Sequence, residues 1–250
     1  YCSSLRQNDR PGAGVPLADR STENCLQTGQ IATVVATSEK KRRAARVVRA
    51  LKKAYPDAKC SLCFDNPLQL LVATILSAQC TDKRVNQVTE DLFKKYRTAA
   101  DFSRLPLQSL EKAIQSTGFF RSKSKNIKAC CQALHDRYDG EVPEDLDDLV
   151  SLAGVGRKTA NVVLGNAFGI ASGVVVDTHV SRISRRLGLT EQTNPVKIES
   201  DLNAQLPRKE WIDFSHRMIQ HGRLICMARR PRCQECSLNT FCPQIGVDHK

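Results

Sequence analysis

The hydrophobic positions of this chain recur with the period of an α-helix along most of its length. Asn66 and Pro67 form a cap and first-turn pair, and apolar residues follow at i, i+3, i+4, i+7 and i+8. These apolar residues are Leu68, Leu71, Val72, Ile75 and Leu76. A second helix is expected to start near Thr81 or Asp82. No segment alternates apolar and polar residues over any length, so the pattern predicts an all-α fold of about ten short helices.

Further helical patterns follow along the chain, and glycine or proline residues mark several of their ends. Pro143 is expected to open one of these helices, and Gly140, Gly188 and Gly222 are expected to end three others. The apolar positions that define these helices fall within residues 107–114, 127–138, 146–150, 180–187, 195–202 and 211–219.

The first 37 residues lack sustained periodicity, and their Ser, Thr, Gly and Gln content predicts a flexible extension. From Glu39 the sequence EKKRRAARVVRALKKAYP has an apolar stripe with basic residues elsewhere, and Pro56 ends the pattern. This helix carries either a solvated basic face or a face that contacts phosphates.

The net charge of the chain limits the kinds of partner that it can be expected to bind. The 250 residues include 38 Lys plus Arg against 26 Asp plus Glu, which gives a formal net charge of +12. This balance favours a polyanionic partner, with nucleic acid ahead of a membrane surface. No apolar run approaches the roughly 20 residues of a membrane span, and the N-terminus lacks a signal-peptide core. We expect an intracellular monomer that folds without a partner.

A glycine turn between two helical patterns is the first candidate for chemistry. Gly154, Val155 and Gly156 allow a sharp turn that presents backbone amides at a helix start, which suits a phosphate. An ordinary helix connection is the competing interpretation. Lys158 follows in the first turn of the next helix, where Arg157 and the helix dipole would favour loss of its proton.

A carboxylate closes the same stretch. Asp177 precedes a further helix and could be a plain N-cap, just as Lys158 alone could be a solvated helix residue. Together, the phosphate anchor, amine and carboxylate predict a catalytic site.

Four cysteines near the C-terminus give the sharpest pattern. Their spacing is C-x6-C-x2-C-x5-C, which brings four thiolates to one compact centre. Disulfides fit least, while zinc and a cubane iron–sulfur cluster both remain open on spacing. Arg229 and Arg230 would give the loop a basic edge towards DNA. The four cysteines are Cys226, Cys233, Cys236 and Cys242.

Taken together, these motifs closely resemble the endonuclease III family of bifunctional helix-hairpin-helix DNA glycosylases. LAGVGRKTA resembles the family's hairpin with its catalytic lysine, VDTHV its aspartate segment, and the cysteine spacing its 4Fe-4S loop. The resemblance covers about residues 39–245. It implies a six-helix barrel over 61–174 and a cluster domain from 38–60 and 175–250, with damaged double-stranded DNA in the cleft between them.

The family's activity supplies further expectations. Its members remove oxidised pyrimidines in base excision repair by flipping the nucleotide out of the duplex. The resemblance implies that Lys158 attacks C1′ and forms a Schiff base for β-elimination, and that Asp177 supports this step. It also implies a 4Fe-4S cofactor on the four cysteines and a bacterial cytoplasmic location.

Two DNA-contact residues follow from the same resemblance. Gln79 in LSAQCTD matches the glutamine that fills the space left by the flipped base. Phe119 in TGFFRSK stands where many members have a leucine wedge, and an aromatic ring can still stack on a base. Ala153 replaces a frequent proline, which predicts a slightly looser turn.

Two alternatives stay open at this point. A mismatch-specific adenine glycosylase lacks the nucleophilic lysine and normally has an extra C-terminal domain, so Lys158 argues against it. A non-catalytic helix-hairpin-helix module would explain the charge, the hairpin and the cysteines without a reaction.

Overall fold

The computed structural model describes residues 38–248 of the chain, which divides into two units, Tyr1–Glu39 and Lys40–Lys250. The extension expected over residues 1–37 lies outside the described residues. Every regular element within residues 38–248 is helical and none is a strand. The all-α prediction is therefore confirmed.

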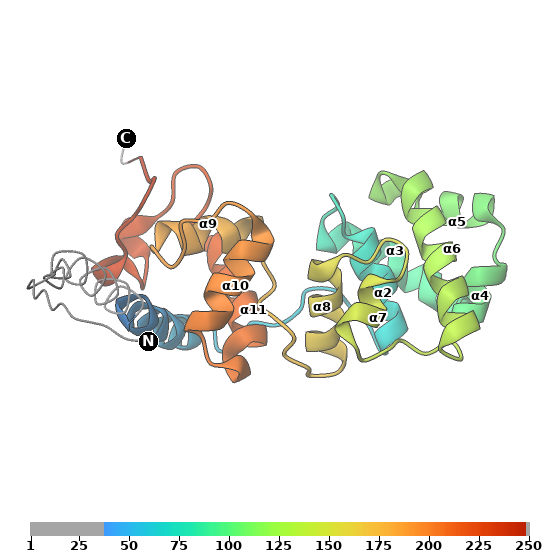
Figure 1. Ribbon diagram of the computed structural model, residues 1–250. Helices are drawn as coiled ribbons and strands as arrows, with labels where there is room; N and C mark the ends of the chain where they lie inside the picture. The colour runs from blue at the N-terminus through green and yellow to red at the C-terminus, as the bar shows by residue number, and fades with distance from the viewer. Residues whose placement is uncertain (1–37, 249–250) are drawn as a thin grey trace, which may run out of the picture. The chain divides into compact units, whose positions relative to one another are not determined.

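The helices of the second unit form two groups (Figure 1). One group contains α2 (Pro67–Leu76), α3 (Asp82–Lys95), α4 (Ala99–Arg104), α5 (Leu107–Ile114), η1 (Gln115–Thr117), α6 (Phe120–Arg137), α7 (Leu146–Val150) and α8 (Arg157–Ala167). The other contains the helix of residues 38–54, α9 (Thr178–Arg186), α10 (Pro195–Gln205), η2 (Arg208–Glu210), α11 (Trp211–Leu224), η3 (Cys233–Glu235) and η4 (Asn239–Phe241).

Side-chain caps set several helix starts where the sequence predicts them. The Asn66 side chain accepts from the Gln69 backbone N–H at the start of α2, and Thr81 caps α3 in the same way. One predicted start is wrong: α7 begins at Leu146 and not at Pro143. Asp145 determines this start because its carboxylate accepts from two first-turn amides.

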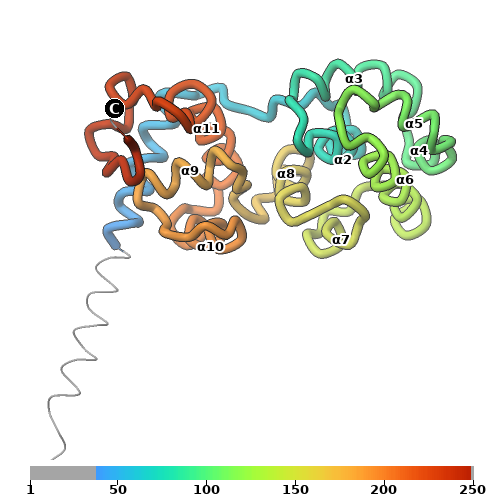
Figure 2. Tube along the Cα trace, turned by 90° about the horizontal axis from the view of Figure 1, so that it is seen from above, coloured from blue at the N-terminus to red at the C-terminus, as the bar shows by residue number. Residues whose placement is uncertain are grey.

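Each group has its own hydrophobic core. The first core combines the buried faces of α2 and α6 with residues of the other helices in that group, including Leu71, Ile127 and Leu164. The second core includes Val47, on the helix of residues 38–54, and Phe214, on α11. Two extended segments pass between the groups (Figure 2). The domain boundaries expected from the resemblance stay a prediction.

Candidate active site and candidate cluster centre

An open pocket of about 1020 Å³ lies where the two helix groups meet. Lys158 from the first group and Asp177, which precedes α9 of the second, both line it. These residues are 19 positions apart in the sequence. The structure therefore brings the predicted amine and the predicted carboxylate to one cavity that is wide enough to admit a nucleotide.

The glycine turn sets the direction in which α8 begins. Gly154 has a φ of +77°, and a Cβ atom there would lie 2.8 Å from Cβ of Asn126 on α6. Glycine is thus required by both backbone conformation and packing. Val155 is buried and anchors the turn. Gly156 caps α8 without a side-chain hydrogen bond, so the first amides of the helix are available to an external acceptor.

A buried carboxylate holds the start of α8 against the second group. Glu199 on α10 accepts from Nε and Nη2 of Arg157 at 2.9 and 3.0 Å, and from Nδ2 of Asn161 at 3.1 Å. The hydrogen bonds that Arg157 donates to Glu199 raise the pKa of the Arg157 guanidinium. Arg157, expected to contact DNA, therefore already has a bidentate partner in the protein, although its side chain is 43% exposed.

Asp177 is both a helix N-cap and a pocket residue, two roles that are alternatives from the sequence alone. Its Oδ1 accepts from the Val180 backbone N–H at 2.8 Å, which makes it the N-cap of α9. The half-buried residue also lines the pocket that contains Lys158. Only one oxygen has this capping role, so the carboxylate can act on a substrate while capping the helix.

The two residues expected to enter DNA lie elsewhere on the first group. Gln79 and Phe119 are exposed, and neither lines the Lys158 pocket. Both have left-handed backbone conformations, with φ of +52° and +49°. The Phe119 side chain is 66% exposed, which is unusual for a phenylalanine.

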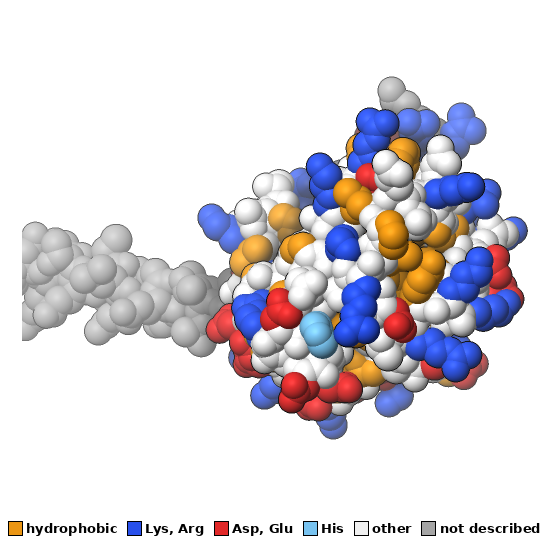
Figure 3. All heavy atoms as spheres, turned by 90° about the vertical axis from the view of Figure 1, so that its right-hand side faces the viewer, with side chains coloured by type: hydrophobic (Ala, Val, Ile, Leu, Met, Phe, Trp, Pro, Cys, Tyr) orange, Lys and Arg blue, Asp and Glu red, His pale blue; other side chains and the backbone are white. Residues whose placement is uncertain are grey.

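Basic side chains spread over the surface of the first group. Figure 3 shows the side formed by α4, α5 and α6, where Lys and Arg are distributed widely and several acidic side chains gather towards the lower edge. In the second group, Arg229 and Arg230 are exposed on the loop between the first two cysteines. Such surfaces favour polyanion binding.

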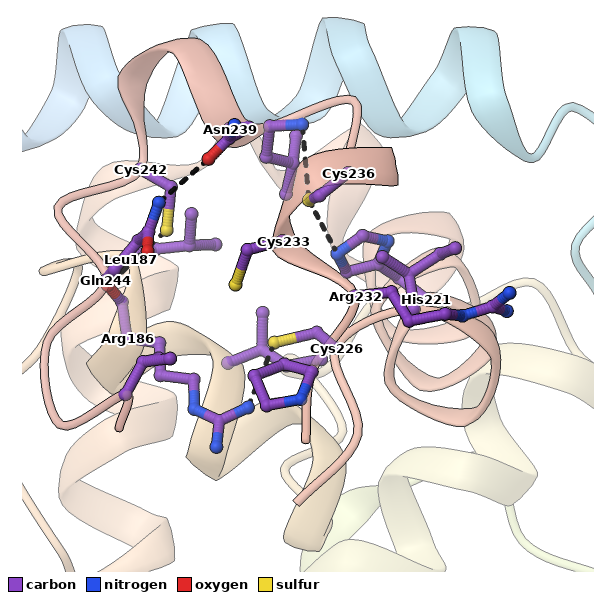
Figure 4. Close-up of a pocket in the computed structure, with 15 residues that line it drawn as sticks. Arg186, Leu187, His221, Cys226, Arg232, Cys233, Cys236, Asn239, Cys242 and Gln244 are labelled. Atoms are coloured by element: carbon purple, nitrogen blue, oxygen red, sulfur yellow. Dashed lines mark hydrogen bonds between the residues drawn. The ribbon is translucent and has the colours of Figure 1, made fainter. Parts of the chain in front are cut away.

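Four cysteine side chains converge on one cavity (Figure 4). Cys226 follows α11, Cys233 opens η3, and Cys236 and Cys242 are the C-cap residues of η3 and η4. Burial is the largest cause that raises the pKa of Cys236 and of Cys242. A bound metal centre would offset this cost because thiolate ligation favours the ionised sulfur.

Donor groups surround these sulfurs. Arg186 on α9 donates to Sγ of Cys226 at 3.3 Å and to the carbonyl of Met227 at 2.7 Å. The Leu238 backbone N–H donates to Sγ of Cys236 at 3.4 Å. Arginines and amides aimed at sulfur would stabilise the negative charge of a thiolate-bound cluster.

The arrangement of sulfurs fits a polynuclear centre. Four cysteine sulfurs face one cavity, and this all-sulfur donor set suits a 4Fe-4S cluster. When bound, the cluster would cross-link α11 to the C-terminal loop and supply a redox-active group.

None of the helices in the described residues is long and apolar enough to cross a membrane.

The structure combines a glycine hairpin at the start of α8, a pocket that contains Lys158 and a loop with four cysteines. This combination is typical of the helix-hairpin-helix class of DNA repair proteins. The family model described as "HhH-GPD superfamily base excision DNA repair protein" matches residues 72–208. That described as "Iron-sulfur binding domain of endonuclease III" matches residues 226–242. The second match begins and ends on Cys226 and Cys242.

Individual relatives narrow the class. Endonuclease III of Synechocystis is 53% identical over 82% of this chain and 94% of its own length. A non-covalent endonuclease III–DNA complex has a TM-score of 0.78 at 46% identity, covering 82% of this chain and 95% of that one. A trapped covalent endonuclease III–DNA intermediate has the same TM-score and identity, covering 82% and 96%.

The chain belongs to the endonuclease III family. It is a base excision repair DNA glycosylase and AP lyase with a 4Fe-4S cofactor. The expectations of family, enzyme class and cofactor drawn from the sequence are confirmed.

Several residues that organise the site carry no sequence signal of their own. Glu199 lies among polar residues of α10, and its burial follows only from packing against α8. Arg223 donates to Asp82 at 2.7 Å and to Ser61 at 3.1 Å, which joins α11 to the start of α3. Lys123 lies in a basic run but is 4% exposed. Contacts between distant segments determine all three positions.

Proposed function

We propose that this enzyme binds duplex DNA and removes oxidised pyrimidines, and that Lys158 is the nucleophile. The observation that carries the proposal is the shared pocket of Lys158 and Asp177 at the junction of the two helix groups. A nucleotide flipped into this pocket would meet an amine from one group and a carboxylate from the other.

The reaction follows from these two groups. Nζ of unprotonated Lys158 attacks C1′ of the deoxyribose, the C1′–N bond to the base breaks, and the base leaves with a proton. The C1′–O4′ bond then breaks as the Nζ lone pair forms the C1′=N double bond of an imine, and O4′ takes up a proton. The protonated imine acidifies the C2′ hydrogen, so loss of that proton forms a C2′–C3′ double bond and expels the 3′ phosphate by β-elimination. Asp177 stabilises positive charge at C1′ and accepts a proton from the amine.

The hairpin supports a DNA-binding role. A Cβ atom on Gly156 would meet no protein atom within 4 Å, so the protein interior gives no reason for glycine there. Close approach of a DNA phosphate to the amides at the start of α8 supplies that reason. This contact would fix the register of the duplex.

Exposed loops complete the proposed complex. Gln79 would fill the space left by the flipped base, and Phe119 would insert beside it. Arg229 and Arg230 would contact the backbone near the cluster loop. We propose that the enzyme acts as a monomer in the bacterial cytoplasm.

Lys158→Gln tests the proposed nucleophile, with Lys59→Gln as its matched control. Lys59 is an exposed lysine of the same pocket. Strand cleavage at an abasic site is expected to fall by about 10² or more in Lys158→Gln and to remain in Lys59→Gln. Binding to the same duplex, measured by fluorescence anisotropy, should persist in both variants.

The substrate class is tested with a panel of duplexes that contain oxidised pyrimidines, oxidised purines or mismatched adenine. Preferential release of oxidised pyrimidines supports the proposal. Preferential release of adenine from a mismatch would support the adenine glycosylase alternative. Binding without any base release or cleavage by the wild type would support the non-catalytic alternative.

A further inference from the structure

A buried lysine joins the two exposed turns that carry Gln79 and Phe119. Lys123 lies in the first turn of α6, and its side-chain amine donates to the carbonyl of Leu76 at 2.8 Å and to the carbonyl of Thr117 at 2.8 Å. Leu76 is the last residue of α2 and Thr117 the last of η1. One ammonium group therefore connects two segments 41 positions apart in the sequence.

Each carbonyl that accepts from Lys123 lies two or three residues before one of the exposed tip residues Gln79 and Phe119. Gln79 comes three residues after Leu76, and Phe119 comes two residues after Thr117. Both tips have a left-handed backbone, which costs a non-glycine residue free energy unless the surroundings hold it. The Lys123 backbone N–H also donates to the carbonyl of Phe119 at 3.1 Å.

A lysine at position 123 needs an explanation because burying a charged amine costs free energy. Burial lowers the pKa of Lys123, and its two recorded acceptors are neutral carbonyls rather than a carboxylate. Carbonyls at helix ends carry partial negative charge and lack intrahelical partners, so they receive an ammonium well. An apolar residue would leave both carbonyls without this donor.

We propose that Lys123 is a positioning residue for damage recognition, which holds the Gln79 turn and the Phe119 turn as one rigid unit that enters the duplex. The proposal rests on the proposed function, in which these two side chains occupy and support the space of a flipped base. Because Lys123 holds both turns in the free protein, less conformational entropy would be lost when these turns enter DNA.

The chain offers a closely matched control. Lys128, on the same helix α6, donates its amine to the carbonyls of Ser103 and Leu105 at the end of α4. Replacing Lys128 by methionine removes the same kind of interaction from a place that carries neither tip. A general loss of stability would therefore affect both variants.

The test compares holoenzymes with Lys123→Met and Lys128→Met. Single-turnover base release from a duplex with an oxidised pyrimidine requires flipping, whereas borohydride trapping on a single-stranded abasic site does not. We expect Lys123→Met to lose about tenfold in the duplex reaction and to retain single-strand trapping. Lys128→Met is expected to leave the ratio of the two rates unchanged.

Two further measurements separate positioning from folding. A 2-aminopurine next to the lesion should brighten when wild type binds and unstacks the site, and brighten less with Lys123→Met. In a Gln79→Ala/Phe119→Ala background, Lys123→Met should cause no additional loss, because the residues through which it acts are absent. Lys123→Gln, which keeps a donor, is expected to lose less than the methionine variant.

The outcomes are distinct. The positioning role would be overturned if the ratio of the duplex base-release rate to the single-strand trapping rate were the same in wild type and in both Lys123 variants. It would also be overturned if Lys123→Met lowered the base-release rate of the Gln79→Ala/Phe119→Ala protein as much as it lowers that of wild type. Should Lys123→Met fail to fold, the same comparison with Lys123→Gln decides. Failure of wild type itself to release a base or trap DNA would instead contradict the proposed function.

Discussion

At the scale of single residues, Asp177 shows how one carboxylate can have a structural and a chemical position at once. Its Oδ1 caps α9, and the residue lines the pocket of Lys158. Asparagine caps helices about as well as aspartate, so the two roles can be separated by one substitution.

We predict that Asp177→Asn retains the stability of the wild type and loses activity. The Asn side-chain oxygen can still accept from the Val180 amide, whereas the negative charge in the pocket is gone. Base release should fall by about 10² or more, and the thermal midpoint should change little. Asp177→Ala should lose both. An Asn variant with wild-type base release would contradict the proposed role of the charge.

A second residue of the pocket gives a pH dependence. Burial lowers the pKa of His216 below its usual 6.5, and its neutral Nε2–H donates to Oδ1 of Asn166 at 2.8 Å. In the unfolded chain His216 takes up a proton near pH 6.5, whereas in the folded chain it takes up that proton only at a lower pH. The stabilising contribution is therefore complete above this pH and is lost as the pH falls below it.

His216→Gln is accordingly predicted to reduce the loss of stability on acidification. The thermal midpoint of the holoprotein, compared at about pH 8 and about pH 5, should fall less in this variant than in wild type. His135→Gln, which changes an exposed histidine of α6, is the control and should resemble wild type. An equal fall of the thermal midpoint in wild type and both variants would contradict the assignment of this pH dependence to His216.

At the scale of elements, the hairpin contains two glycines that serve different purposes. Gly154 has a positive φ and packs against Asn126, whereas the Cβ direction of Gly156 is open. The first glycine is a requirement of the fold, and the second would be explained by the DNA phosphate that we propose approaches the helix start.

Alanine substitutions should therefore separate stability from DNA binding. Gly154→Ala is expected to destabilise the protein by about 1–3 kcal/mol through strain and overpacking. Gly156→Ala should change the unfolding free energy by less than about 1 kcal/mol but weaken binding to duplex DNA. Chemical denaturation and fluorescence anisotropy measure the two effects. Tight DNA binding by Gly156→Ala would argue against a phosphate at this turn.

The sequence predicts elements with strong local signals and misses those without them. The apolar stripe and the Asn66 cap define α2 well because both are local. The short α4 escapes the periodicity argument, and its signal is the capping box of Thr98 and Asp101. Lys123 and Glu199 could not be assigned because their acceptors and donors come from other helices.

At the scale of the whole molecule, the second helix group gathers around the four cysteines. Arg46 on the helix of residues 38–54 lies 4.3 Å from the ring centroid of Phe241, and Arg186 on α9 bonds to Cys226. The helix of residues 38–54 thus packs against the cysteine-containing C-terminal segment, and α9 contributes Arg186 to the cavity itself. A bound cluster would hold them together.

Cys236→Ser should therefore reduce the broad visible absorbance of thiolate-bound iron and lower the thermal midpoint. Cys63→Ser changes an exposed cysteine outside the four and should retain both properties. Iron content and the visible spectrum of the purified proteins provide the check. A colourless wild type with one zinc per chain would contradict cluster binding by these residues.

The central claim is that two helix groups bring the amine of Lys158 to a flipped deoxyribose. Its most direct test is to trap wild type on abasic duplex DNA with borohydride, digest the adduct and locate the modified residue by mass spectrometry. The account predicts the reduced sugar on Lys158. Attachment to Lys59, to another lysine or to the N-terminal amine would contradict it.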